Sequence, residues 1–378
     1  MFPGSRRSPL LGALGAAVLL LSACGGASDA GTPATGKGTP LKVAFANYTE
    51  AGPVFHATTV RLDQQVAETG AAVEIKWFDN AGDPAKMLSN ANLMVQAKPD
   101  VLIEYPVAEN SAGVKKVFEK SGIPCIALNL PLQGCAFINI DNPKMGKSAA
   151  AIAAAEAKKR GWTAADTTVL IGQNATAGPS VNGNVTAFYS AFADAFGLPP
   201  VAEDAITPTT TTIGANGIQF DGKSDQNVSF NAVRGLLAGL DKGRKLVLYT
   251  CNDDETQGAY RAVQDAGRSA DVIVVGHGGG REDTLKALRD DPNWIAQDVF
   301  FEEYWGEYVI AMAQAMKGGA TPPELTILPS TTIGKADLGK FYDPATLKLK
   351  LLPPLDETNS YLAKGGFLQL VGNIEGLK

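Results

Sequence analysis

The chain has 378 residues, with 33 basic and 39 acidic side chains and a formal net charge of −6. This length is enough for two domains of ordinary size. The acidic balance, together with the lack of any basic cluster beyond Arg6 and Arg7, argues against nucleic acid as a partner.

The first residues have the pattern of an export signal. Arg6 and Arg7 precede an apolar run from Leu10 to Leu21, which is too short to span a bilayer comfortably. The run closes on Leu21-Ser22-Ala23-Cys24, which resembles the lipobox of bacterial lipoproteins. The pattern predicts a signal peptide over residues 1–23 and lipid, including palmitate-type acyl chains, on Cys24. The alternative is an ordinary secretion signal in which Cys24 is incidental.

A flexible tether is predicted for residues 24–40. This stretch consists mostly of Gly, Ala, Ser, Thr and Pro and contains no large apolar side chain, so it cannot build a core. The later sequence contains no apolar run of membrane-spanning length. Contact with a membrane is therefore expected through the lipid anchor alone.

Three further cysteines follow Cys24, at positions 125, 135 and 251. In an oxidising compartment Cys125 and Cys135 could form a disulfide, and Cys251 would then be a small buried hydrophobe. Three unpaired core thiols are an equally good interpretation of the sequence. The pairing stays open at this point.

From Leu41 onward, short apolar runs alternate with helical stretches. Most runs are rich in Val, Ile and Leu without strict alternation, as expected of strands buried on both faces. Strand, helix and strand in series predict parallel sheets, and two groups of such units predict an α/β fold with two doubly wound lobes. The predicted strands are 41–46, 73–78, 101–105, 124–128 and 136–140 in one group, and 168–172, 245–250, 272–276 and 294–299 in the other.

Ligands of open parallel sheets bind at the carboxyl ends of the strands. The residues at those ends are mainly side-chain amides and aromatics, a set that lacks a paired nucleophile and base. Amides and carboxylates suit vicinal hydroxyls, and aromatic faces cover the C–H surfaces of a sugar ring. The alternative is that Asn, Asp and Gly follow strands because they make turns. The ligand-binding candidates at these ends include Asn47, Tyr48, Asp79, Tyr105, Asn129, Asn252 and His277.

Five motifs, in this order and spacing, resemble the type I periplasmic sugar-binding proteins of ABC transporters, the ribose-binding and galactose-binding group. They are Asp79-Asn-Ala-Gly-Asp-Pro, Gly122-Ile-Pro-Cys-Ile-Ala-Leu-Asn129, Asp141-Asn-Pro-Lys-Met-Gly146, Asn252-Asp-Asp254 and Val274-Val-Gly276. The resemblance covers about residues 41–320.

The resemblance implies roles for particular residues. The family's stacking aromatic falls on Phe55, its arginine at the start of a second-lobe helix on Asn182, and its conserved asparagine on Asn252. The charged pair after the fourth strand is here Asn129-Leu130, the Phe-Asp pair is His277-Gly278, and the glutamine of the last crossover lies nearest Phe300. The departures point away from ribose or glucose and toward another sugar, polyol or sugar derivative.

The resemblance also implies two lobes joined by three hinge segments, near 140–141, 300–301 and 320–325, that close around the ligand. The first lobe is expected to contain residues 41–140 and 301–322. The second is expected to contain residues 141–300 and 323–378, the last part as an irregular tail. The implied protein is a monomeric, extracytoplasmic, lipid-anchored binding protein without a cofactor, which delivers its ligand to the subunits of an ABC permease.

Two other functions fit parts of the sequence. The same fold could present its ligand to a receptor kinase or chemoreceptor. The stretch from His277 to Gly280 resembles the oxyanion-hole motif of some esterases, but the sequence has no Gly-x-Ser-x-Gly elbow, and the one other histidine, His56, comes too early in the chain to serve as the base. No catalytic residue is predicted. Nor is a metal site, because Asp79 to Asp83 lacks the alternating ligands of a calcium loop.

Overall fold

The computed structural model describes residues 39–107 and 109–377, all within one compact unit. The predicted signal peptide, Cys24 and the tether up to residue 38 lie outside the described residues. Two sheets dominated by parallel strands form the framework, and the predicted fold class is confirmed. Among the described helices, none combines the length and apolar character needed to cross a bilayer.

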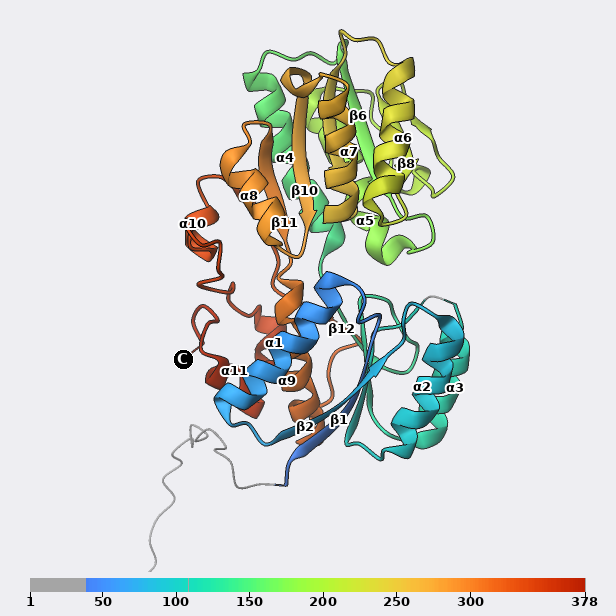
Figure 1. Cartoon of the computed structure of the whole chain (residues 1–378), viewed down its shortest axis with the longest axis vertical. Helices are drawn as coiled ribbons and strands as arrows, with labels where there is room; N and C mark the ends of the chain where they lie inside the picture. The colour runs from blue at the N-terminus through green and yellow to red at the C-terminus, as the bar shows by residue number, and fades with distance from the viewer. Residues whose placement is uncertain (1–38, 108, 378) are drawn as a thin grey trace, which may run out of the picture. The chain divides into compact units, whose positions relative to one another are not determined.

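The first sheet has six strands in the order β12-β5-β4-β3-β1-β2, all paired in parallel. Helices α2 and α3 lie on one side of it, and α1 and α9 lie on the other (Figure 1). The strands are β1 (Leu41–Asn47), β2 (Val73–Asp79), β3 (Val101–Glu104), β4 (Cys125–Leu128), β5 (Ala136–Asn139) and β12 (Leu325–Ile327). The helices are α1 (Pro53–Thr69), α2 (Pro84–Gln96), α3 (Ser111–Ser121) and α9 (Trp305–Lys317).

The second sheet has seven strands in the order β13-β11-β10-β9-β6-β8-β7, with antiparallel pairing only at its two edges. Its strands are β6 (Thr167–Gln173), β7 (Thr212–Ile213), β8 (Gly217–Asp221), β9 (Lys245–Thr250), β10 (Val272–Gly278), β11 (Trp294–Val299) and β13 (Thr331–Gly334). Its helices are α4 (Asn142–Lys159), α5 (Pro179–Phe196), α6 (Gln226–Gly239), α7 (Asp253–Asp265) and α8 (Glu282–Asp290).

Short helical elements complete the described chain. They are η1 (Glu203–Ala205), η2 (Ser269–Asp271), η3 (Glu302–Tyr304), α10 (Leu338–Phe341), η4 (Glu357–Gly365) and α11 (Phe367–Val371). Of these, η3 follows directly on the crossover from the second sheet back to the first, so its residues lie close to the strand ends of both sheets.

The central strands are apolar because helices cover both of their faces. Every residue of β3, β4, β6 and β10 is buried, as the continuous apolar runs predict. The helix start at Asp83 also follows the sequence, because its side chain accepts a hydrogen bond from the Lys86 amide and Pro84 occupies the first helical position.

Two helix pairs of the second sheet pack through glycine. A Cβ on Gly146 of α4 would lie 2.1 Å from the backbone oxygen of Asn184 in α5. Likewise, a Cβ on Gly258 of α7 would lie 2.0 Å from the backbone oxygen of Gln226 in α6. Both distances are far below van der Waals contact, so only glycine permits these approaches.

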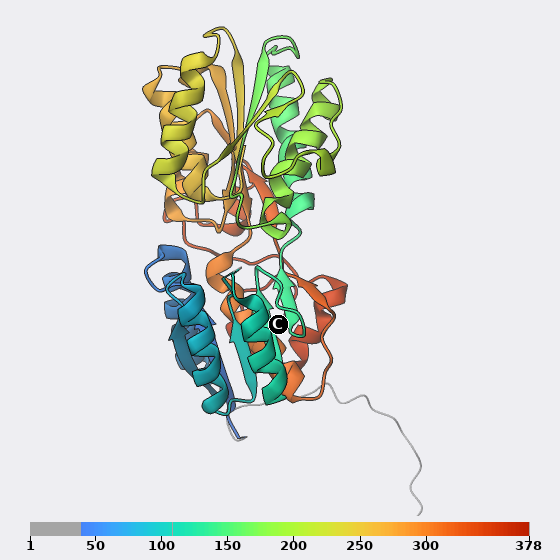
Figure 2. The ribbon, with the colours of Figure 1, turned by 90° about the vertical axis from the view of Figure 1, so that its right-hand side faces the viewer.

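The C-terminal segment differs from the expected second-lobe tail. Strand β12 pairs with β5 of the first sheet, whereas β13 pairs with β11 of the second, so the third crossover lies at 328–330 and not at 320–325. The segment then returns, because η4 and α11 pack against α9 beside the first sheet (Figure 1, Figure 2). The assignment of 323–378 to the second lobe is therefore wrong for β12, η4 and α11.

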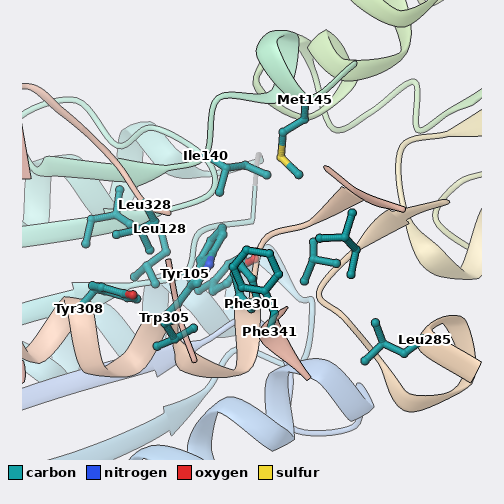
Figure 3. Packing of buried hydrophobic residues seen from close by; sticks show 14 of the residues in the cluster. Tyr105, Leu128, Ile140, Met145, Leu285, Phe301, Trp305, Tyr308, Leu328 and Phe341 are labelled. Carbon is teal, nitrogen blue, oxygen red and sulfur yellow. The ribbon is translucent and has the colours of Figure 1, made fainter. Parts of the chain in front are cut away.

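Aromatic side chains of this segment reach the crossover after β11. Phe341 packs against Phe301 with ring centroids 6.0 Å apart, and Tyr342 stacks on Phe301 at 6.2 Å. Phe301 is buried and has a left-handed backbone, with φ of 51°. Figure 3 shows Phe301 and Phe341 within the same buried cluster as Tyr105 and Trp305.

A disulfide joins Cys125 at the start of β4 to Cys135 just before β5. Of the two alternatives left open by the sequence, the structure has the paired one. Cys251 is free and buried.

Candidate ligand-binding site

A cavity of about 490 Å³ lies at the carboxyl ends of strands from both sheets. Its size is within the range of small-molecule sites. Strand order reverses between β1 and β3 in the first sheet and between β6 and β9 in the second. Both reversals are switch points, where the loops after neighbouring strands diverge and leave a crevice. The topology of each sheet therefore directs its strand ends toward the cavity.

Seven of the ten predicted ligand-binding residues line this cavity: Tyr48, Phe55, Tyr105, Asn129, Asn252, His277 and Phe300. The remaining three, Asn47, Asp79 and Asn182, are not among the lining residues.

Aromatic side chains form two groups in the lining. In the first group, Phe55 meets Tyr105 edge to face at 5.0 Å and Tyr48 at 5.2 Å. In the second group, Phe300 lies 5.3 Å from His277 and 5.9 Å from Trp305. The first group comes from the ends of β1 and β3 and the start of α1, and the second from β10 and the crossover after β11. Apolar ring faces thus reach the cavity from both sheets.

The three predicted residues outside the lining are engaged in local structure. The Asn47 amide donates to the Phe55 carbonyl oxygen at 2.8 Å, and its oxygen accepts from the Tyr48 amide. Asp79 accepts from the backbone amide of Ala81. Asn182 is bonded to both the amide and the carbonyl of Asn174. These side chains bond mainly to local backbone, the alternative that the sequence left open, and Asp79 Oδ2 also pairs with the Lys86 side chain at 3.3 Å.

The two asparagines in the lining are held differently. Asn129 has a left-handed backbone, with φ of 62°, a conformation that Asn tolerates better than most residues. Asn252 is the N-cap of α7, where its Oδ1 accepts from the Glu255 amide at 2.9 Å. The cap occupies that oxygen and leaves the Asn252 amide NH₂ as the group available to a ligand.

His277 belongs to strand β10 and is 2% exposed. The strand predicted over 272–276 thus continues through His277 to Gly278, alongside β11. The imidazole Nδ1 lies 3.0 Å from Asp298 Oδ2 and 3.1 Å from the Tyr249 hydroxyl. Both partners are fully buried.

Two carboxyl groups in the lining lie in surroundings that disfavour charge. Burial raises the pKa of Asp253 to about 7, against the opposing effect of the nearby Arg281 guanidinium. Burial also raises the pKa of Glu302 to about 7, although the Tyr105 hydroxyl donates to it at 2.7 Å. Near neutral pH these groups are therefore poised to donate or accept a hydrogen bond.

Several lining residues were missed from the sequence. Lys223 and Ser224 follow β8, and both have left-handed backbones with φ of 54°. Arg281 follows β10 and pairs with Asp254 and Asp283, each at 2.6 Å. The candidate residues were those at the ends of predicted strands. Because β8 was not predicted, Lys223 and Ser224 were not among them. Glu302 and Trp305 follow the crossover after β11, and no sequence motif includes them.

No group of three or more potential metal ligands occurs among residues 39–107 and 109–377. The lining combines aromatic faces with amide and carboxyl groups, which can satisfy several hydroxyl groups at once.

Comparison with solved structures finds the same fold in proteins of low sequence identity. A solute-binding protein of an ABC transporter from Mycobacterium smegmatis, with bound glycerol, has a TM-score of 0.64 and 19% identity, and the match covers 80% of this chain and 96% of that one. A periplasmic ribose ABC transporter protein from Conexibacter woesei has a TM-score of 0.63 and 19% identity, over 81% and 96%. A solute-binding protein from Bacillus halodurans, with bound myo-inositol, has a TM-score of 0.62 and 16% identity, over 80% and 98%.

A search of curated protein sequences finds no match. The family model of the periplasmic binding protein domain matches residues 43–321, which is most of the chain and includes nearly all of the cavity-forming strands. The chain therefore belongs to the periplasmic binding protein family.

Proposed function

We propose that the protein captures a sugar or polyol in the cavity between the strand ends. The observation that carries this proposal is the presence of aromatic rings from both sheets in a cavity whose polar lining is mostly amide and carboxyl groups. Rings cover the C–H faces of a polyhydroxy ligand, and amides and carboxyls pair with its hydroxyls. The structural relatives with bound glycerol and myo-inositol support this ligand class.

Delivery to the permease of an ABC transporter is the second part of the proposal. It is supported by family membership and by solved relatives that are themselves described as ABC transporter proteins. In this role the protein works outside the cytoplasm as a monomer, closes on its ligand and is tethered through lipid on Cys24. Presentation of the same ligand to a receptor is the alternative use of the site.

The proposed function involves no catalysis. In the lining, Cys251 is the strongest nucleophile by type, but burial raises the pKa of its thiol well above the ordinary value, and so it resists forming the thiolate. The His277 Nδ1 faces a carboxylate, and no serine, threonine or cysteine side chain within the described chain bonds to its other nitrogen.

A thermal-shift screen tests the ligand class directly. The protein, purified as the Cys24→Ser variant, is heated with pentoses, hexoses, polyols and, as a contrasting set, amino acids. A ligand at 100 times its dissociation constant should raise the unfolding free energy by about 2.7 kcal/mol. Stabilisation by amino acids and by none of the sugars or polyols would contradict the proposal.

Anchoring is tested separately by fractionation. Cys24→Ser should move the protein from the membrane to the soluble fraction and abolish incorporation of labelled fatty acid. Incorporation that persists in Cys24→Ser would place the lipid on another residue and would contradict the assignment to Cys24.

A further inference from the structure

His277, which lines the cavity, belongs to a buried cluster of hydrogen-bonded side chains. His277 Nδ1, the Tyr249 hydroxyl and Asp298 Oδ2 lie within 3.1 Å of one another, and the Tyr249 hydroxyl is 2.5 Å from the carboxylate. Asp298 lies in β11 and is 0% exposed. Three neighbouring strands of the second sheet, β9, β10 and β11, therefore each contribute one member.

Counting the protons of this cluster fixes the state of the imidazole. The Tyr249 hydroxyl has one proton, and its short contact with Asp298 Oδ2 takes that proton. The 3.0 Å contact between His277 Nδ1 and the same carboxylate oxygen then requires a proton on Nδ1, because two lone pairs would repel at this distance. In the neutral imidazole, a proton on Nδ1 leaves Nε2 as an acceptor.

The second oxygen of the Asp298 carboxylate is held from the C-terminal segment. The Thr332 hydroxyl donates to Asp298 Oδ1, and Thr332 lies in β13, which pairs with β11 at this residue. Thr332 lies outside residues 43–321, the part of the chain that matches the family model. The C-terminal segment thus reaches the site through a threonine, a carboxylate and an imidazole in series.

We infer that Thr332 and Asp298 are positioning residues that hold His277 in the Nδ1-protonated form and so present Nε2 to the cavity as a hydrogen-bond acceptor. His277 lines the cavity, and within the described chain Nε2 has no hydrogen-bond partner. The complementary ligand group is a donor, such as a sugar hydroxyl. This inference rests on the proposed function for the identity of the donor, but the tautomer itself does not depend on it.

The tautomer can be measured without knowing the ligand. Nitrogen-15 NMR of the imidazole side chains distinguishes protonated from unprotonated ring nitrogens, and the chain has only two histidines. The His56→Gln variant assigns the signals. At a pH where the imidazole is neutral, His277 should show a protonated Nδ1 and an unprotonated Nε2. A wild-type His277 with the proton on Nε2 would overturn the inference.

Two variants test what fixes the tautomer. In Asp298→Asn, the new amide can either accept from Nδ1 or donate to it, so the Nε2-protonated form should appear. Thr332→Val removes a single donor from Asp298 and should shift the Nδ1 signal, whereas the matched control Thr331→Val, one residue earlier in β13, should not. Unchanged His277 signals in Thr332→Val would show that Thr332 does not position His277 through Asp298, and would overturn that part of the inference.

Binding separates this inference from the proposed function. With a sugar found by the thermal-shift screen, Asp298→Asn should bind at least about 10-fold more weakly, the cost of about 1.4 kcal/mol for one mispaired hydrogen bond. An unchanged affinity would overturn the role of Nε2 in recognition while leaving sugar binding intact. If no sugar or polyol binds while His277 shows the inferred tautomer, the proposed function fails, but the role of Asp298 and Thr332 in fixing the tautomer of His277 remains supported.

Discussion

Asn129 and Asn252 reach the same cavity under different backbone constraints, which determines how each can be tested. Asn129 occupies a left-handed conformation, so an alanine there would add strain unrelated to the ligand. Asn252 caps α7, so an alanine there would weaken the helix by about 0.5 to 2 kcal/mol. Substitutions that respect these constraints isolate the side-chain groups that face the ligand.

Asn129→Gly and Asn252→Ser should each weaken sugar binding by about 5- to 150-fold, because a buried ligand hydroxyl loses its partner at a cost of about 1 to 3 kcal/mol. Glycine keeps the left-handed backbone, and serine keeps the cap. Calorimetric titration with the identified ligand measures the affinity, and thermal unfolding checks that stability is unchanged. Unaltered affinity in both variants would place the recognition groups elsewhere in the lining.

For individual residues at the strand ends, the sequence predicted the type of side chain better than whether that side chain faces the cavity. Tyr48 lines the cavity, whereas its neighbour Asn47 turns back to bind the start of α1. Asn47 ends β1 and Tyr48 follows it, and whether a polar group at this end faces a ligand or a turn depends on the loop that comes next. Arg281 and Glu302 were missed because their positions depend on a loop and a crossover that have no periodic pattern.

The close packing of α4 on α5 predicts that a larger residue at Gly146 destabilises the protein. Gly146→Ala should destabilise the protein by about 1 to 3 kcal/mol or more, because the added methyl would meet the Asn184 backbone at 2.1 Å and backbone cannot rotate away as a side chain can. Denaturant unfolding measures the change. The variant should keep its affinity for the identified ligand if it remains folded, since Gly146 does not line the cavity.

Gly235 provides the matched control. It lies within α6, is exposed, and a Cβ there would have no atom within 4 Å. Gly235→Ala should therefore stabilise the protein by about 0.4 to 1 kcal/mol through helix propensity alone. Equal effects of the two substitutions, in sign and size, would show that close packing of α4 on α5 does not distinguish Gly146.

Most of the strands that the sequence predicted are buried on both faces, although the edge strand β2 is not. All nine predicted runs correspond to strands, whereas β7, β8, β12 and β13 were missed. Three of the missed strands have two to four residues, too few for a pattern, and β8 mixes buried and partly exposed positions. These strands exist because a neighbouring edge supplies hydrogen bonds, and that information is not local in sequence.

For the molecule as a whole, buried carboxyl groups should make stability depend on pH. Burial raises the pKa of Glu104 from the ordinary 4.5 to about 8, even with a hydrogen bond from Asn80, and its Oε2 has no partner. Between these two values the folded protein holds a proton that the unfolded chain releases. The free energy of unfolding therefore falls as pH rises from about 4.5 through 8, with a slope of up to about 1.4 kcal/mol per pH unit for this group.

Glu104→Gln should remove this contribution. Between pH 5.5 and 8.5, the free energy of unfolding should fall by about 1 to 4 kcal/mol less in the variant than in the wild type. Denaturant unfolding at the two pH values gives the comparison, and Glu74→Gln, at an exposed position of β2, is the control that should behave as wild type. Parallel pH dependence in Glu104→Gln and wild type would mean that Glu104 is already ionised when folded.

The pairing of β12 and β13 determines where the chain can be cut. A recombinant version that stops at residue 321, where the family match ends, would lack both strands and leave β5 and β11 with unpaired backbone amides and carbonyls. Bare strand edges recruit strands from other molecules. Such a shortened protein would tend to aggregate during purification, so expression for crystallisation or for building a sugar sensor requires the chain through its C-terminal helices.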